Sequence, residues 1–150
     1  LEFRRVLFRS LDKSDRRAFV MIGDGEMQEG SVWEAAMAAA HHELGNLKVI
    51  LDRNRIQNDD FCETQMRMFD IPAKWRAFGW NVKEIDGHDM NEVVEGMNFL
   101  SETNDGPSIL IAHTVKGKGV SFMEDNPAFH GAAPNDEQYA QALTELGVSV

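Results

Sequence analysis

The chain of 150 residues has a formal net charge of −10 and a single cysteine, Cys62. The acidic balance argues against binding to nucleic acid or to an anionic membrane, because both interactions need basic patches. One cysteine excludes an internal disulfide framework and suits a reducing cytoplasm, and no apolar run approaches the length of a membrane span.

The first ten residues, LEFRRVLFRS, place arginines among isolated apolar side chains. We interpret residues 1–10 as a translated cloning or sequencing adapter that does not belong to the fold, with a natural basic arm as the alternative. Residues 11–150 are then expected to form one domain with a substantial core.

Two apolar runs, 19–22 and 47–51, flank an alanine-rich segment whose apolar residues recur at helical spacing. Strand, helix and strand at this length predict a right-handed crossover with two parallel strands that are neighbours in the sheet. Ser31 and Glu34 predict a capping box at the start of the helix, and Gly45 is expected just past its end. The expected inward face of the helix comprises Trp33, Ala36, Met37, Ala40 and Leu44.

The segment 59–71 is polar, with scattered Met and Phe, and predicts an ordered loop with a short helix. Pro72 is expected to open a helix over 73–78 that buries Trp75 and Phe78, and 80–85 predicts the third strand. Asp89 and Glu92 predict a second capping box. The apolar face of the helix that follows comprises Met90, Val93, Val94, Met97 and Leu100.

A buried strand is predicted over 108–115, followed by a long loop and a final helix over 135–146. The inward residues of that helix are expected to be Tyr139, Ala142, Leu143 and Leu146. Strands alternating with helices in this way predict a doubly wound α/β fold with a mostly parallel sheet.

Polar residues follow the first two strands where each one ends. Asp24 lies between Gly23 and Gly25 after the first strand, and Asn54 follows the second. Their oxygens can converge on a hard cation such as Mg²⁺ or Ca²⁺, and the glycines allow the backbone to approach a phosphate. Gly-Asp-Gly alone can also be an ordinary turn; the downstream Asn54 favours a metal–diphosphate site.

Three further polar features remain open at this stage. His88 follows the third strand and is interpreted as either a ligand-binding residue or a solvated turn residue. The segment 116–119, Lys-Gly-Lys-Gly, is either a phosphate contact or a flexible turn. His130 is, from the residues alone, a loop histidine.

These residues carry a family resemblance. Gly23-Asp24-Gly25 followed about thirty residues later by Asn54 resembles the motif of thiamine diphosphate enzymes. Met27-Gln28-Glu29-Gly30 and Trp33-Glu34-Ala35 are similar to the transketolase family, notably to the N-terminal subunit of split transketolases. The similarity continues through Leu51 to Gln57, His113 to Gly119, and His130-Gly131, and covers residues 17–147.

The resemblance implies a thiamine diphosphate-binding fold and two cofactors, thiamine diphosphate and Mg²⁺. Asp24, the side chain of Asn54 and the backbone carbonyl of Ile56 are expected to bind Mg²⁺. Gly23, Asp24, Gly25, Asn54 and His130 are expected to contact the cofactor.

Glu29 and His130 are the implied catalytic residues, with Glu29 near the cofactor across a dimer contact and His130 touching the diphosphate and the sugar. The implied reaction moves a two-carbon ketol unit from a ketose phosphate to an aldose phosphate. The glutamate that activates the aminopyrimidine belongs to a separate pyrimidine-binding domain or subunit, so a homo- or hetero-oligomer is expected.

Family members carry more than a hundred residues before the Gly-Asp-Gly strand. We therefore expect this chain to be truncated, to expose an apolar sheet edge and to be inactive alone. The alternatives are a deoxyxylulose-phosphate synthase or 2-oxo acid dehydrogenase subunit, a non-catalytic nucleotide- or metal-binding α/β module, and a partner subunit with a dead site.

Overall fold

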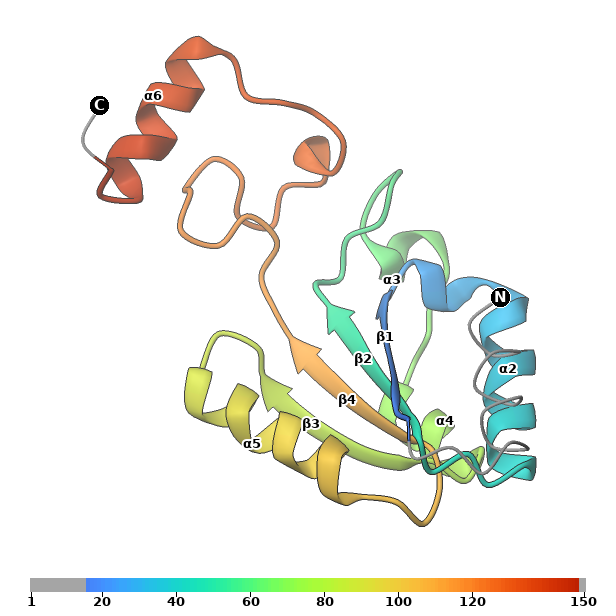
Figure 1. Ribbon diagram of the computed structural model, residues 1–150. Coiled ribbons are helices and arrows are strands. Elements are labelled where there is room, and N and C mark those ends of the chain that lie inside the picture. Colours follow the sequence, from blue (N-terminus) through green and yellow to red (C-terminus); the bar gives the residue numbers. More distant parts are fainter. Residues whose placement is uncertain (1–15, 149–150) are drawn as a thin grey trace.

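Four parallel strands form a single sheet in the order β1-β2-β4-β3 in the computed structural model, which describes residues 16–148 (Figure 1). The strands are β1 (Ala18–Gly23), β2 (Leu47–Arg53), β3 (Asn81–Asp86) and β4 (Ser108–His113). β1 and β2 pair in register from Ala18 opposite Leu47 to Gly23 opposite Asp52, so the expected parallel neighbours are confirmed. The interpretation of residues 1–10 lies outside the described residues.

Helices cover both faces of the sheet, which confirms the α/β class and the doubly wound arrangement. α2 (Gly30–His41) and α4 (Ile71–Ala77) lie on one face, over a core that includes Trp75 and Trp80. α5 (Met90–Glu102) lies on the other face, where Leu100 packs against Leu110 of β4. The remaining elements are η1 (Glu26–Gln28), α3 (Cys62–Gln65), η2 (Pro127–Phe129) and α6 (Asp136–Glu145).

The start of α2 differs from the sequence prediction. Glu29 is the N-cap, with an extended backbone and no side-chain capping bond, and the helix begins at Gly30. The expected capping box of Ser31 and Glu34 is wrong, because Ser31 already lies inside the first helical turn. Met37, expected to face inward, is 52% exposed.

The end of α2 is closed by a residue other than the expected glycine. Glu43 adopts a left-handed backbone with φ 49°, and the N–H of Leu44 donates to the carbonyl of Ala39 at 3.1 Å. This is the hydrogen-bond pattern that usually carries glycine at the left-handed position. Gly45 has a different role: a Cβ there would lie 2.1 Å from the carbonyl oxygen of Asn104.

The two later helices begin at aspartates. Asp70 accepts a hydrogen bond from the N–H of Ala73 at 2.9 Å, so α4 starts at Ile71 and Pro72 is its second residue. Asp89 caps α5 as expected, through the N–H of Asn91. The reciprocal half of that capping box is wrong: Glu92 accepts from the N–H of Asp86, the last residue of β3, at 2.7 Å.

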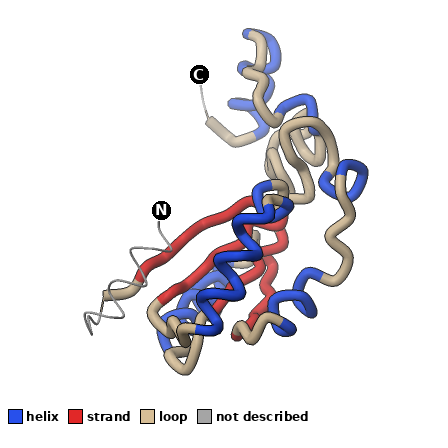
Figure 2. The backbone as a smooth tube through the Cα atoms, turned by 90° about the vertical axis from the view of Figure 1, so that its right-hand side faces the viewer, coloured by secondary structure: helices blue, strands red, loops and turns tan. Residues whose placement is uncertain are grey.

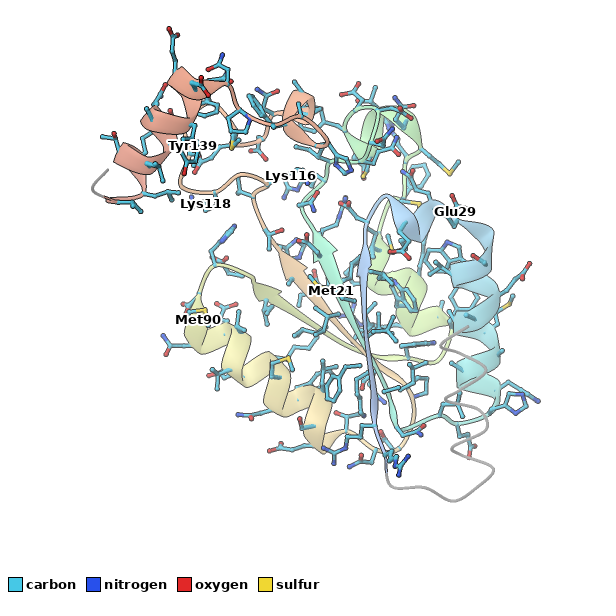
Figure 3. All side chains as sticks on the ribbon, turned by 45° about the horizontal axis from the view of Figure 1, so that its top comes forward. Met21, Glu29, Met90, Lys116, Lys118 and Tyr139 are labelled. Carbon is cyan, nitrogen blue, oxygen red and sulfur yellow. The ribbon has the colours of Figure 1, made fainter. Side chains whose placement is uncertain are left out.

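The face of the sheet that carries α5 is only partly covered. β1 is an edge strand of the described sheet, and its Phe19 and Met21 are 48% and 68% exposed. Met21 is labelled in Figure 3. α5 lies over β3 and β4, and its Met90 and Val94, expected to face inward, are 68% and 57% exposed. Among residues 16–148, the edge of the sheet at β1 therefore carries exposed apolar side chains.

The segment 114–148 extends beyond the carboxyl end of the sheet and carries α6 at its far end (Figures 1 and 2). Glu145 of α6 accepts hydrogen bonds from the backbone N–H and hydroxyl of Ser121, at 2.6 and 2.7 Å. α6 packs mainly on its own loop, so its buried face is narrow. Tyr139 and Leu146, expected to face inward, are 57% and 55% exposed.

The close approach at Gly45 gives a test of the packing between the end of α2 and the turn before β4. Gly45→Ala is expected to lower the free energy of unfolding by about 1–3 kcal/mol, because the added methyl group meets a backbone oxygen that cannot move freely. Chemical denaturation measures the change. Gly30→Ala, where a Cβ meets nothing within 4 Å, is the control. Equal stability of the two variants would contradict the packing described.

Candidate functional site

Asp24 follows β1 directly and is 1% exposed, which is unusual for a carboxylate. Its Oδ2 accepts hydrogen bonds from Arg53 Nη1 and from the backbone N–H of Arg55, both at 2.6 Å. Its Oδ1 accepts from the Cys62 thiol at 3.3 Å. The Arg53 contact is an ion pair, so the buried charge is neutralised within the protein.

Asn54 follows β2 and lies in sequence between Arg53 and Arg55, two of the residues that contact Asp24. Its Nδ2 donates to Asp52 Oδ2 at 2.8 Å, while its Oδ1 accepts from the N–H of Ile56 at 3.0 Å. These two bonds fix which side of the amide carries the oxygen. Asp52 is held in turn by the hydroxyl of Thr114, just past β4. The ends of two neighbouring strands, β2 and β4, therefore support the orientation of one amide.

The backbone after Asp24 passes close to the loop that follows β2. A Cβ on Gly25 would lie 2.5 Å from the Cβ of Gln57, so only glycine fits. Gly23, at the end of β1, has nothing within 4 Å of a Cβ, so its surroundings do not require glycine. Arg55, between these loops, has a left-handed backbone with φ 68°, a conformation that a side chain makes costly and that often marks a functional loop.

Cys62 lies at the site, in contact with Asp24. Its side chain is fully buried, and it begins the short helix α3. Burial, followed by the charge of Asp24 and the hydrogen bond to it, raises the pKa of the thiol to about 12. The thiol therefore stays protonated at neutral pH and can donate to Asp24.

The two expected catalytic residues lie at the surface. Glu29 is exposed at the start of α2, above the sheet (Figure 3). His130 is exposed at the end of η2, on the segment that extends past the sheet. Within residues 16–148, neither Glu29 nor His130 forms a hydrogen bond or ion pair with Asp24 or Asn54.

His88 and the segment 116–119, the other polar features noted in the sequence, contact residues outside the Asp24 site. His88 Nε2 accepts from the N–H of Val115 at 2.8 Å, so His88 joins the end of β3 to the segment after β4. Lys118 lies 3.8 Å from Glu124, and Gly117 and Gly119 have left-handed backbones that form the turn.

A cavity of about 730 Å³ lies between β1, β2 and α2. Its lining is largely apolar and includes Val20, Ile22, Ala35 and Trp80, but neither Asp24 nor Asn54. The candidate site is therefore the sheet edge and not this cavity.

The residues at the edge fit a hard cation bound together with phosphate. No group of three or more His, Cys, Asp or Glu side chains able to hold a metal occurs within residues 16–148, so a cage built from such side chains alone is absent there. One buried carboxylate and one oriented amide, at the ends of neighbouring strands, instead suit the chemistry of Mg²⁺, which commonly completes its six ligands with phosphate oxygens and water. The close approach of Gly25 to Gln57 also brings the backbone after β1 close to the loop after β2.

Comparison with known proteins identifies the family. Residues 8–150 match the family model of the transketolase thiamine diphosphate binding domain. The chain belongs to the transketolase family. No helix among the described residues is long and apolar enough to cross a membrane.

Curated relatives include components of split transketolases. The chain is 43% identical over 136 residues to an apulose-4-phosphate transketolase subunit from Phocaeicola vulgatus, covering 91% of this chain and 48% of that protein. It is 37% identical over 136 residues to a 6-deoxy-6-sulfo-D-fructose transketolase subunit from a Clostridium species, covering 91% of this chain and 50% of the relative. The chain thus spans about half the length of these relatives.

Full-length transketolases share the fold. The crystal structure of transketolase from Campylobacter jejuni superimposes with a TM-score of 0.87 at 26% identity, covering 98% of this chain and 24% of that one. Human transketolase is 35% identical over 135 residues, covering 90% of this chain and 21% of that protein. These matches confirm the family resemblance and the fold class inferred from the sequence.

Sequence reasoning did not anticipate the contacts of Arg53, Cys62 and Glu63. Arg53 Nη2 donates to Glu63 Oε1 at 3.0 Å while Nη1 holds Asp24. The position of Arg53 between two polar residues at a strand end was a usable signal, because a basic residue there can reach a neighbouring acid. Cys62 and Glu63 reach the site because the loop after β2 folds back toward Asp24, and no local pattern in the sequence indicates this.

The environment of Cys62 predicts slow thiol chemistry. Iodoacetamide at pH 8 is expected to alkylate the folded chain at least about tenfold more slowly than the chain unfolded in guanidinium, because burial and the raised pKa remove the reactive thiolate. Mass spectrometry follows the single adduct, and Cys62→Ser, which should take up none, is the control. Equal rates in the folded and unfolded chains would show that Cys62 is accessible.

Proposed function

We propose that this chain is the diphosphate-binding portion of a transketolase-type transferase that binds thiamine diphosphate and Mg²⁺. The observation that carries the proposal is the buried Asp24 carboxylate beside the oriented amide of Asn54, at the ends of two neighbouring strands. The family membership supports the same cofactor.

Each residue of the site has a defined task in this proposal. Asp24 supplies the charge that binds Mg²⁺, and the Asn54 amide oxygen and the Ile56 carbonyl supply two neutral ligands. Gly23 and Gly25 let the backbone approach the diphosphate. Asp52 and Thr114 hold Asn54 in place, as partners behind a metal ligand commonly do.

Thiamine diphosphate, when bound, supplies the carbanion chemistry for moving a two-carbon ketol unit from a ketose phosphate to an aldose phosphate. Glu29 is proposed to act near the cofactor at a subunit contact, and His130 to contact the diphosphate and the sugar. The exposure of both side chains suits residues that meet a partner or a ligand.

The chain is proposed to work with a pyrimidine-binding subunit or domain in a cytoplasmic homo- or hetero-oligomer, and to be inactive alone. Two relatives described above are named as subunits, which supports a partner. Turnover of xylulose 5-phosphate by the purified chain without a partner would refute the proposed inactivity.

Calorimetric titration of thiamine diphosphate, with and without Mg²⁺, tests the site. Binding to the chain is expected to require Mg²⁺ and to weaken at least about tenfold, or about 1.4 kcal/mol, in Asp24→Asn, because the metal loses its charged ligand. Asp59→Asn removes an exposed carboxylate from the neighbouring loop and is expected to leave binding unchanged.

The titration is then repeated in the presence of a pyrimidine-binding partner. Thermal melts of each variant establish that Asp24→Asn is folded at the temperature used. Absence of Mg²⁺-dependent binding in the presence of the partner would refute the proposed function for this chain.

A further inference from the structure

Arg53 forms an ion pair with Asp24, the carboxylate that the proposed metal would need as a ligand. Its side chain is 11% exposed and bridges two acids, with Nη1 2.6 Å from Asp24 Oδ2 and Nη2 3.0 Å from Glu63 Oε1. The same Asp24 oxygen also accepts the N–H of Arg55. Arg53 is thus the cation that neutralises Asp24 in this structure.

A buried carboxylate and a buried guanidinium stabilise each other only while they remain paired. A divalent cation bound to Asp24 would stand next to the guanidinium, and two positive charges at that distance repel strongly where solvent is excluded. The lone pairs of Oδ2 are also already used, by Arg53 and by Arg55. Metal binding at Asp24 therefore requires Arg53 to loosen its hold.

Glu63 offers Arg53 an alternative partner. It lies in the short helix α3 and is 45% exposed, so its carboxylate faces the solvent side of the guanidinium. An arginine that already donates to Glu63 can turn away from Asp24 without losing all of its ion-pair partners. Because Arg53 contacts both acids, its guanidinium can leave Asp24 by moving toward Glu63.

We propose that Arg53 is an internal counter-cation that occupies Asp24 in the metal-free chain and is released onto Glu63 when a divalent cation binds. The inference rests on the proposed function and deepens it. Arg53 is a positioning residue in this account: it stabilises the site before metal binds and sets the affinity of the site for metal by competing with it.

The test compares Arg53→Met with wild type in two measurements. In the metal-free chain, Arg53→Met is expected to melt at a lower temperature, because Asp24 loses its counter-charge. At a fixed concentration of thiamine diphosphate, with a pyrimidine-binding partner present, the same variant is expected to bind Mg²⁺ about tenfold more tightly. A purely structural role would lower both stability and affinity, so opposite signs identify competition.

Glu63→Gln tests the release without disturbing the pair of Asp24 and Arg53. It is expected to weaken Mg²⁺ binding about threefold, because Arg53 then has no charged partner other than Asp24 at this bridge. Asp59→Asn removes a negative charge from the same loop region without touching Arg53, and serves as the matched control for the general loss of charge. Arg67→Met is the control for the loss of an exposed arginine.

Mg²⁺ binding by Arg53→Met that is equal to or weaker than that of wild type would overturn the inference, and weaker binding together with lower stability would indicate a purely structural role. Glu63→Gln indistinguishable from Asp59→Asn would also overturn it. If Arg53→Met does not fold, Arg53→Lys, with a shorter reach to Asp24, is expected to bind Mg²⁺ more tightly than wild type. Absence of Mg²⁺ binding in wild type as well as in every variant refutes the proposed function itself, a result distinct from the others.

Discussion

A carboxylate that is 1% exposed must be neutralised, and the sheet edge of this protein is arranged around that requirement. Asp24 lies where β1 ends, and its partners come from the end of the neighbouring strand β2 and from the segment that follows it. Arg53, the N–H of Arg55 and the Cys62 thiol meet it there, and they fix the path of residues 53–62. The left-handed backbone of Arg55 and the tight passage at Gly25 are the local costs of that path.

The parts of the fold set by local pattern could be predicted from the sequence. Continuous apolar runs identified β1, β2 and β4, and the length of the crossover determined that β1 and β2 are parallel neighbours. Helix ends were less predictable, because Ser31 and Gly45 are residue types common at helix ends, while the N-cap is Glu29 and the left-handed residue that follows the helix is Glu43. Side-chain capping is one small term among several, and the packing of α2 on the sheet overrides it.

The candidate site was predictable only in part, for a related reason. Asp24 and Asn54 follow strands that a sequence pattern can identify, so the structure brings their loops together as parallel pairing requires. Glu63 and the fully buried Cys62 reach the site only because the loop after β2 folds back onto it. Such contacts depend on tertiary structure, and a single sequence carries little trace of them.

The most direct measurement of the central claim is a backbone amide NMR titration of the ¹⁵N-labelled chain with Mg²⁺ and thiamine diphosphate. If the cation and diphosphate bind at the ends of β1 and β2, the largest shifts should occur at Gly25, Arg55 and Ile56, since the N–H groups of Arg55 and Ile56 donate to Asp24 and Asn54. Shifts confined to α5, or to residues of α2 that line the cavity, would contradict the account, because Asp24 and Asn54 belong to neither.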